Sequence, residues 1–232
     1  MTSSLPPFHL LNAPDTRLPG PSSTSFTLTP PLTSMTDIWR KPGPPEINTF
    51  NAPVIYKIIN LATFQRVRVT LAGAWDTLYD QGGLVLIVPD PECSQNDATE
   101  AARNGQWVKS GIEFVDDAPK VGSVACDRWA DWSLVTEGIV PASGGEANST
   151  QVTIEMERRP TDDTLWVYVV QDGKRSGVRE VTWLLSLAKD EDGKPKDIEA
   201  WVGVYAATPT IVEDAKPLNV KFEGFELELR EL

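Results

Sequence analysis

Residues 64–71 read FQRVRVTL, so apolar and polar side chains alternate along this stretch. Val67, Val69 and Leu71 fall on one face, and the two arginines fall on the other. A period of two is typical of a β-strand with one buried face and one face in water. Comparable runs occupy residues 54–59, 83–88, 106–115, 121–127, 151–158, 164–170, 178–187, 200–206 and 218–229.

Turn-forming residues separate many of these runs, and helical periodicity is weak throughout. The turn candidates are Gly82-Gly83, Asp116-Asp117, Ser143-Gly144-Gly145, Asp172-Gly173 and Asp192-Gly193. Residues 96–103 offer at most one or two helical turns. About ten strands without crossover helices predict an all-β fold, an antiparallel β-sandwich or jelly roll.

The N-terminal part of the chain has a different composition. Eleven of the 19 prolines precede residue 54, and this density prevents a continuous helix and removes backbone donors that a sheet needs. We therefore expect residues 1–25 to form a Pro/Ser/Thr-rich leader, mobile or draped over the surface. Residues 26–232 are predicted to form one domain, beginning with a short edge strand at residues 26–29.

The charge balance excludes several classes of partner. Acidic residues outnumber basic ones 33 to 21, which gives a net charge of −12 over 232 residues. Nucleic acids and anionic membranes bind largely through Lys and Arg, so neither is expected as a partner. No run approaches the length of a membrane span, and no secretory signal is recognisable.

Cysteine and histidine are scarce, which limits the possible chemistry. Cys93 and Cys126 are expected to be free thiols, and together with His9 they cannot complete a four-ligand zinc site. His9 lies among prolines, so a nucleophilic triad has no credible base. Glycine loops of the common nucleotide-binding types are absent, and neither cofactor nor metal is expected. These features predict a cytoplasmic protein, in which the sequon at residues 148–150 stays unmodified.

The run at residues 106–114 is the most informative for function. Alternation places four residues on one face: Trp107, Lys109, Gly111 and Glu113. An aromatic plate, a cation, a carboxylate and a glycine gap would suit a ligand such as a sugar. The alternative, left open here, is a solvent-exposed face carrying a Lys–Glu pair.

Two further polar features of the sequence have plain structural explanations. Glu155 and Glu157 share a strand face at about 7 Å along it, a spacing tolerable for a glycosidase pair. Because Arg158 and Arg159 follow directly, a solvated charged edge is the preferred interpretation. Polar insertions occur at residues 89–105, 141–150 and 189–199, and the first and last of them could serve as contacts for a protein partner. The charged 189–197 stretch is interpreted as a solvated turn rather than a calcium loop.

Several short motifs, taken together and in order, resemble a known family. They are TDIWRK at residues 36–41, NAP at 51–53, LYDQGGL at 78–84, WVKSGIEF at 107–114, DWS at 131–133 and VGVYAATP at 202–209. The sequence resembles the domain-of-unknown-function family that includes the fungal regulation-of-enolase proteins and bacterial relatives associated with pectin-degradation operons. The resemblance covers roughly residues 26–229. It implies a concanavalin A-like lectin/glucanase jelly roll.

The resemblance also implies a set of groove residues. The matched positions are Asp37, Trp39, Asn51, Tyr79, Asp80, Gln81, Trp107, Lys109, Glu113, Asp131, Trp132 and Tyr205. All of them except Asp131 are carried forward as candidate ligand-binding residues. The Glu-x-Asp-x-Glu strand motif usual in jelly-roll hydrolases does not occur.

Three functions remain in competition. The preferred hypothesis is a non-catalytic module that binds a carbohydrate or small metabolite in a concave groove. The first alternative is an enzyme, a glycan hydrolase or lyase or a small-molecule isomerase or cyclase, with Glu113 or Asp80 as acid or base and Lys109 or Tyr79 as the opposing proton carrier. The second is a regulatory protein that binds another protein, such as a metabolic enzyme.

Overall fold

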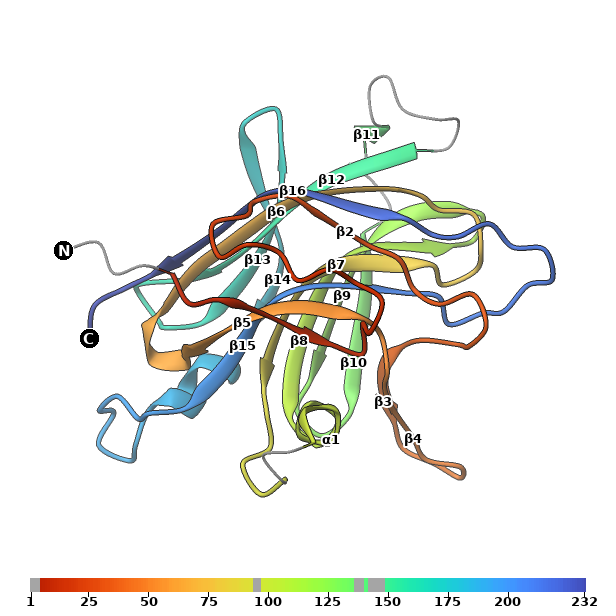
Figure 1. The fold of residues 1–232 in the computed structure, drawn as a ribbon. Helices are drawn as coiled ribbons and strands as arrows, with labels where there is room; N and C mark the ends of the chain where they lie inside the picture. Colours follow the sequence, from red (N-terminus) through yellow and green to blue (C-terminus); the bar gives the residue numbers. More distant parts are fainter. Residues whose placement is uncertain (1–4, 94–96, 136–139, 142–148) are drawn as a thin grey trace.

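A computed structural model describes the chain except for residues 1–4, 94–96, 136–139 and 142–148. Two antiparallel sheets lie face to face (Figure 1), which confirms the predicted all-β antiparallel sandwich. Residues 143–145 and Asn148, assigned above to a turn and a sequon, lie outside the described residues. Most of the 141–150 insertion lies outside them as well.

The first sheet, sheet A, has the order β1-β5-β15-β7-β8-β9-β10. Its strands are Phe8–Leu11 (β1), Val54–Asn60 (β5), Glu199–Ala207 (β15), Gln81–Val88 (β7), Gln106–Val115 (β8), Ala118–Cys126 (β9) and Ala130–Val135 (β10). Strand β7 is buried along its whole length. Its continuous apolar run, rather than an alternating one, is typical of a strand covered on both faces.

The second sheet, sheet B, has the order β14-β13-β12-β6-β16-β2, and β11 pairs with β12. Its strands are Lys174–Val181 (β14), Leu165–Gln171 (β13), Ser149–Arg158 (β12), Phe64–Ala74 (β6), Val220–Leu229 (β16), Phe26–Leu28 (β2) and Val140–Pro141 (β11). The strand expected from residue 64 onward is thus confirmed as β6, a central strand. The expected edge strand at residues 26–29 is confirmed as β2.

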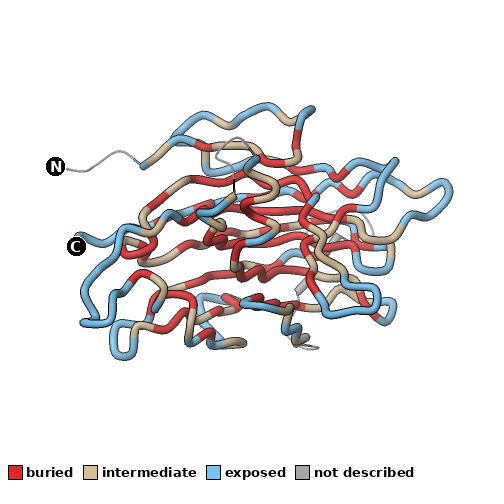
Figure 2. Tube along the Cα trace, turned by 90° about the horizontal axis from the view of Figure 1, so that it is seen from below, coloured by how far each residue is buried: buried red, intermediate tan, exposed pale blue. Residues whose placement is uncertain are grey.

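The main core fills the space between the two sheets, and Figure 2 shows buried strands inside with exposed loops around them. Its side chains alternate inward from both sheets, as the period of two requires. Fully buried examples are Ile55, Leu84, Leu86, Val108 and Val202 from sheet A, and Val67, Val69, Leu71, Ile154 and Phe222 from sheet B.

A second apolar cluster lies on the outer face of sheet A. There the hairpin of β3 (Ile38–Lys41) and β4 (Ile47–Phe50), together with helix α1 (Ala98–Asn104), contributes Ile38, Phe50 and Ala102 against strands of the sheet. Arg40 fastens this cover, since it is buried and its Nη2 donates to the carbonyl of Gly105 over 2.9 Å. Sheet A is therefore covered on both faces over much of its area.

Some local assignments differ from the sequence expectation. The run at 178–187 is not one strand, because β14 ends at Val181 and a 3₁₀ turn, η2, follows at Leu184–Ala188. Strands β1, β3, β4 and β10 were not expected as separate strands. Helix α1 begins inside the expected 96–103 region and ends one residue after it, at Asn104. Asp97 caps its N-terminus, because the Asp97 carboxylate accepts a hydrogen bond from the Glu100 amide over 3.0 Å.

The leader expected at residues 1–25 is partly built into the sandwich. Strand β1 pairs antiparallel with β5 at the edge of sheet A, and Phe8 is buried in the main core. Lys57, itself only 1% exposed, donates from Nζ to the carbonyl of Pro21 over 3.0 Å and also to the carbonyl of Pro6. The same ammonium lies 3.9 Å from the centre of the Phe8 ring. A buried cation thus anchors the leader.

Other expectations concern absences and thiols. Cys93 and Cys126 are free, as expected. Over the described ranges, no helix has the length and apolar character needed to cross a membrane. No group of three or more His, Cys, Asp or Glu side chains that could hold a metal ion is found in those ranges.

Replacing Lys57 tests the anchoring of the leader. We expect Lys57→Ala to lower the free energy of unfolding by about 2–4 kcal/mol, because two buried carbonyls lose their donor. Amide hydrogen exchange should also speed up across residues 8–11. Urea unfolding and exchange mass spectrometry measure the two effects. The control is Lys174→Ala on the exposed start of β14, and an equal loss in both variants would contradict the anchoring role.

Candidate functional site

A cavity of about 450 Å³ opens on the outer face of sheet A, at the end that the hairpin leaves free. Its walls come from β3, the β6–β7 loop, β7, β8, β9, β10 and the segment after β15. The lining residues are Asp37, Trp39, Lys41, Tyr79, Gln81, Lys109, Glu113, Val124, Trp132, Pro209 and Thr210.

Glycines shape the floor of this cavity. Gly111 lies between Lys109 and Glu113 on β8, and a Cβ there would come within 1.9 Å of a backbone carbonyl of β7. A Cβ at Gly122, its neighbour on β9, would come within 2.9 Å of Glu113 Oε2. The close strand approach at Gly111 thus requires glycine, and Gly122 leaves space for the Glu113 carboxyl.

Lys109 is a buried cation at the centre of the floor, with 3% of its surface exposed. Its Nζ donates to Gln81 Oε1 over 2.5 Å and lies 3.7 Å from Asp37 Oδ1. The rings of Trp107 and Tyr205 lie beside it, with centroids 5.9 and 5.4 Å from Nζ. Its charge is balanced by a neutral amide, a carboxylate and aromatic faces.

Asp37 is held rigidly in the wall. Its Oδ1 accepts from the Ile38 amide over 2.7 Å and from Gln81 Nε2 over 3.4 Å. Asn51 supports it from behind, since Asn51 Oδ1 accepts from the Asp37 amide over 2.8 Å. Asn51 is therefore a positioning residue and does not line the cavity.

Glu113 faces Lys109 and Asp37 across the floor. Burial is the main reason that the pKa of its carboxyl is raised, and the charge of Asp37 adds to this. Lys109 and a hydrogen bond with Trp132 act in the opposite direction. A carboxyl whose proton is held to higher pH can donate a hydrogen bond or act as a general acid.

Aromatic side chains form the rim. The Trp132 ring centroid lies 6.4 Å from that of Trp39 and 6.4 Å from that of Tyr79, both in edge-to-face geometry. Trp132 is 36% exposed and Tyr79 38%, so apolar ring area faces the opening. Tyr79 has a φ of +67°, and its amide donates to the Phe114 carbonyl over 2.8 Å.

Asp80 lies behind the rim and not in the cavity. It is 3% exposed, its Oδ2 accepts from the Thr77 amide over 3.1 Å, and its Oδ1 has no partner among the described residues. Burial raises the pKa of its carboxyl to about 6. Asp80 therefore shapes the loop that carries Tyr79.

The structure brings most of the candidate residues together. Seven of them line the cavity: Asp37, Trp39, Tyr79, Gln81, Lys109, Glu113 and Trp132. Four do not: Asn51 and Asp80 support neighbouring segments, Tyr205 is 3% exposed beside Lys109, and Trp107 is 1% exposed. Asp131, another position of the family pattern, pairs with Arg179 over 2.7 Å.

The placement of Trp107 corrects the idea of a sugar-binding plate on β8. Its ring packs edge to face on Phe50, with centroids 6.5 Å apart, under the β3–β4 hairpin. The hairpin covers the end of the face where Trp107 lies and leaves the Glu113 end open. The alternative of a solvent-exposed face is also wrong at Lys109, which is buried.

Four lining residues were missed: Lys41, Val124, Pro209 and Thr210. Lys41 follows Trp39 by two positions and so shares its strand face, a signal that alternation offers. Pro209 closes the VGVYAATP motif. Val124 and Thr210 carry no distinguishing pattern.

The charged residues of β12 are also placed differently from expectation. Glu155 is only 2% exposed and pairs with Arg66 over 2.9 Å and with Arg175 over 2.7 Å. Glu157 is bound by Arg175 as well, so both carboxylates are engaged in ion pairs. Arg158 was expected on a solvated edge but is 2% exposed. Its neighbour Arg159 is exposed, as expected.

This geometry defines an antiparallel β-sandwich with a polar, aromatic-rimmed cavity on the outer face of one sheet. The chain belongs to the family described as "Protein of unknown function (DUF1349)", whose model matches residues 19–229. That result confirms the resemblance inferred from the motifs.

Individual relatives are fungal. The chain is 43% identical over 175 residues to "Uncharacterized protein AN7484" of Emericella nidulans, covering 75% of this chain and 74% of that protein. It is 30% identical over 71 residues to "Regulation of enolase protein 1" of Saccharomyces cerevisiae, covering 31% and 29%. A crystal structure of a functionally unknown Saccharomyces cerevisiae protein superposes with a TM-score of 0.63 at 21% identity, covering 97% of each chain.

The buried carboxyl of Asp80 predicts a pH dependence of stability. The pKa of Asp80 is about 6 in the folded protein and near 4 when unfolded, so the folded state binds the proton more tightly. Stability from this group is present below about pH 4 and is lost as pH rises through about 6, with a change on the order of 2–3 kcal/mol.

Asp80→Asn cannot ionise, so it should not lose stability as the pH rises. The free energy of unfolding of the variant relative to the wild type should therefore be higher at pH 7 than at pH 4. Urea unfolding at both values measures the difference. Glu191→Gln, on an exposed hairpin, is the matched control. It should leave the change in unfolding free energy between pH 4 and pH 7 as it is in the wild type. If the unfolding free energy changed equally with pH in the wild type and in Asp80→Asn, Asp80 would not be a source of the pH dependence.

Proposed function

We propose that this protein binds a small hydroxyl-rich ligand, a saccharide or a similar polar metabolite, in the cavity on sheet A, without turning it over. The cavity volume of about 450 Å³ lies within the range of roughly 300–1,000 Å³ found for small-molecule sites. Cys93 and Cys126 are free thiols, which suits a reducing compartment such as the cytoplasm. Cytoplasmic metabolites are therefore included among the proposed ligands.

The observation that carries the proposal is the combination of a polar floor with an aromatic rim. Lys109, Gln81 and Glu113 offer donors and acceptors at fixed positions. Tyr79 and Trp132 expose ring area at the opening, and an aromatic ring can cover the apolar face of a sugar ring. Specific small-molecule sites usually combine apolar walls with a small number of polar groups at fixed positions.

A specific observation also favours a second function, acid–base catalysis in the same cavity. Burial raises the pKa of Glu113, and Lys109 lies on the same floor. Perturbed ionisable groups gather at catalytic sites more often than elsewhere. The catalytic alternative now depends on Glu113, Lys109 and Tyr79, since Asp80 lies outside the cavity.

Trp132→Ala tests the location of the ligand. A thermal-shift screen against mono-, oligo- and uronic-acid saccharides should give a hit whose effect rises with concentration. Trp132→Ala should weaken that hit by roughly tenfold, about 1.4 kcal/mol, because it removes an exposed ring from the rim. Isothermal titration measures the affinity.

The matched control is Trp166→Ala, whose ring lies on β13 of the other sheet against Tyr168. Equal weakening in both variants would place the ligand elsewhere. Silence across the library would count against a saccharide and would favour a macromolecular partner, such as a metabolic enzyme.

Glu113→Gln separates binding from catalysis. The proposal predicts that the wild-type protein returns a bound ligand chemically unchanged and that Glu113→Gln still binds it. Chromatography of the incubated ligand and titration of the variant measure these outcomes. A product formed by the wild type and lost by 10²–10⁴-fold in Glu113→Gln would establish the catalytic alternative instead.

A further inference from the structure

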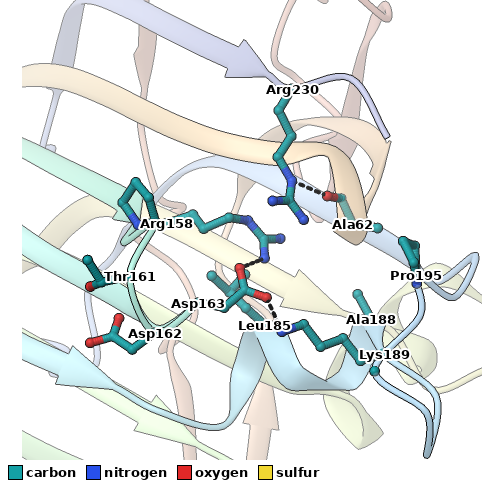
Figure 3. Close-up of a pocket in the computed structure, with 12 residues that line it drawn as sticks. Ala62, Arg158, Thr161, Asp162, Asp163, Leu185, Ala188, Lys189, Pro195 and Arg230 are labelled. Carbon is teal, nitrogen blue, oxygen red and sulfur yellow. Dashed lines mark hydrogen bonds and ion pairs between the residues drawn. The ribbon is translucent and has the colours of Figure 1, made fainter.

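A second cavity, of about 400 Å³, lies away from the first, where the β12–β13 turn meets η1 (Leu61–Thr63) and η2 (Figure 3). Three cationic side chains line it: Arg158, Lys189 and Arg230. The chain as a whole carries a net charge of −12, so a local concentration of positive charge needs an explanation.

Arg158 forms the fixed floor of this cavity. Its side chain is 2% exposed, its Nε donates to the Phe64 carbonyl over 2.7 Å, and its Nη2 donates to the Leu61 carbonyl over 2.9 Å. Its Nη1 donates to Asp163 Oδ1. These bonds hold the guanidinium at the base of the cavity in one orientation.

A single carboxylate serves two of the cations. Asp163 binds Arg158 through Oδ1 and Lys189 through Oδ2, the latter over 2.6 Å. The second acidic side chain of the lining, Asp162, lies 3.8 Å from Arg159 and points away from the cluster in Figure 3. Three cations and two carboxylates thus line the cavity, and of the two carboxylates only Asp163 is paired with those cations.

Among the described residues, Arg230 is the lining cation for which no counterion is found. Its Nε donates to the Ala62 carbonyl over 2.9 Å, and among the residues that the structure describes its two Nη groups make no hydrogen bond or ion pair. Figure 3 shows its guanidinium directed toward that of Arg158. The charge of Arg230 adds to burial in lowering the pKa of Arg158, which reflects this like-charge proximity.

We propose that this cavity binds a phosphate dianion, either inorganic phosphate or the phosphoryl group of a small metabolite. Two guanidinium groups facing one space offer several N–H donors to phosphate oxygens in planar, directed pairs. An anion bound there also compensates the positive charge of Arg230, which no carboxylate among the described lining residues pairs with. Ala62, Leu185 and Pro195 supply apolar wall area beside the charged cluster, where the organic part of an ester would fit.

Isothermal titration of the full chain with inorganic phosphate, at constant ionic strength set with sodium chloride, tests the proposal. The wild type should bind, and Arg230→Gln should bind at least about tenfold more weakly, because charge-assisted hydrogen bonds are lost. Arg230 is exposed, so this variant should fold; Lys189→Gln provides a second variant with the same expected direction.

Arg17→Gln, at an exposed position of the leader, is the matched control and should bind phosphate like the wild type. No binding by the wild type, or equal affinities in wild type and Arg230→Gln, would overturn the proposal. Glucose 6-phosphate and glucose distinguish the source of the anion. If glucose 6-phosphate binds more tightly than inorganic phosphate, the ligand is a phosphorylated metabolite; if the two bind equally, the ligand is phosphate itself. Glucose, which lacks the phosphoryl group, should not displace phosphate from the cavity.

Discussion

The buried guanidinium of Arg40 connects three parts of the molecule that are distant in sequence. It contacts the Asn48 side chain of its own hairpin over 3.2 Å, the Gly105 carbonyl at the end of α1 over 2.9 Å and the Asp127 carbonyl after β9 over 3.3 Å. These bonds fasten the β3–β4 hairpin and α1 over sheet A. The hairpin in turn determines which part of the outer face is covered and which part becomes the cavity.

The period of two in the sequence predicted the sheets but not this cover. Alternation along β8 correctly placed Trp107, Lys109 and Glu113 on one face. It could not show that residues 38–50, far earlier in the chain, bury Trp107 and leave Glu113 at the opening. Motif resemblance gathered seven lining residues because the motifs mark segments that meet in space, whereas Val124 has an ordinary strand environment and gives no signal.

Buried charges account for the other departures from expectation. Lys57 lies in an otherwise apolar run, VIYKII at residues 54–59, whereas Arg158 follows charged residues that look solvent-facing. A charged residue is rarely buried without partners, so neither burial was expected. Both satisfy their donors with backbone carbonyls from segments distant in sequence, and those acceptors are invisible to local patterns. The two cavities also differ in charge: the one on sheet A is lined by two acidic side chains and two lysines, and the other by three cations and two acidic side chains. The described part of the chain thus presents two chemically distinct cavities.

The pairing of β1 with β5 has a consequence for how the chain tolerates change at its N-terminus. Strand β1 occupies the edge of sheet A, and without it β5 would present a row of unpaired amides and carbonyls to solvent. Exposed edges of this kind recruit strands from other molecules. A version of the protein that begins at residue 26 would therefore gain a self-association surface, through strand exchange between copies, that strand β1 suppresses.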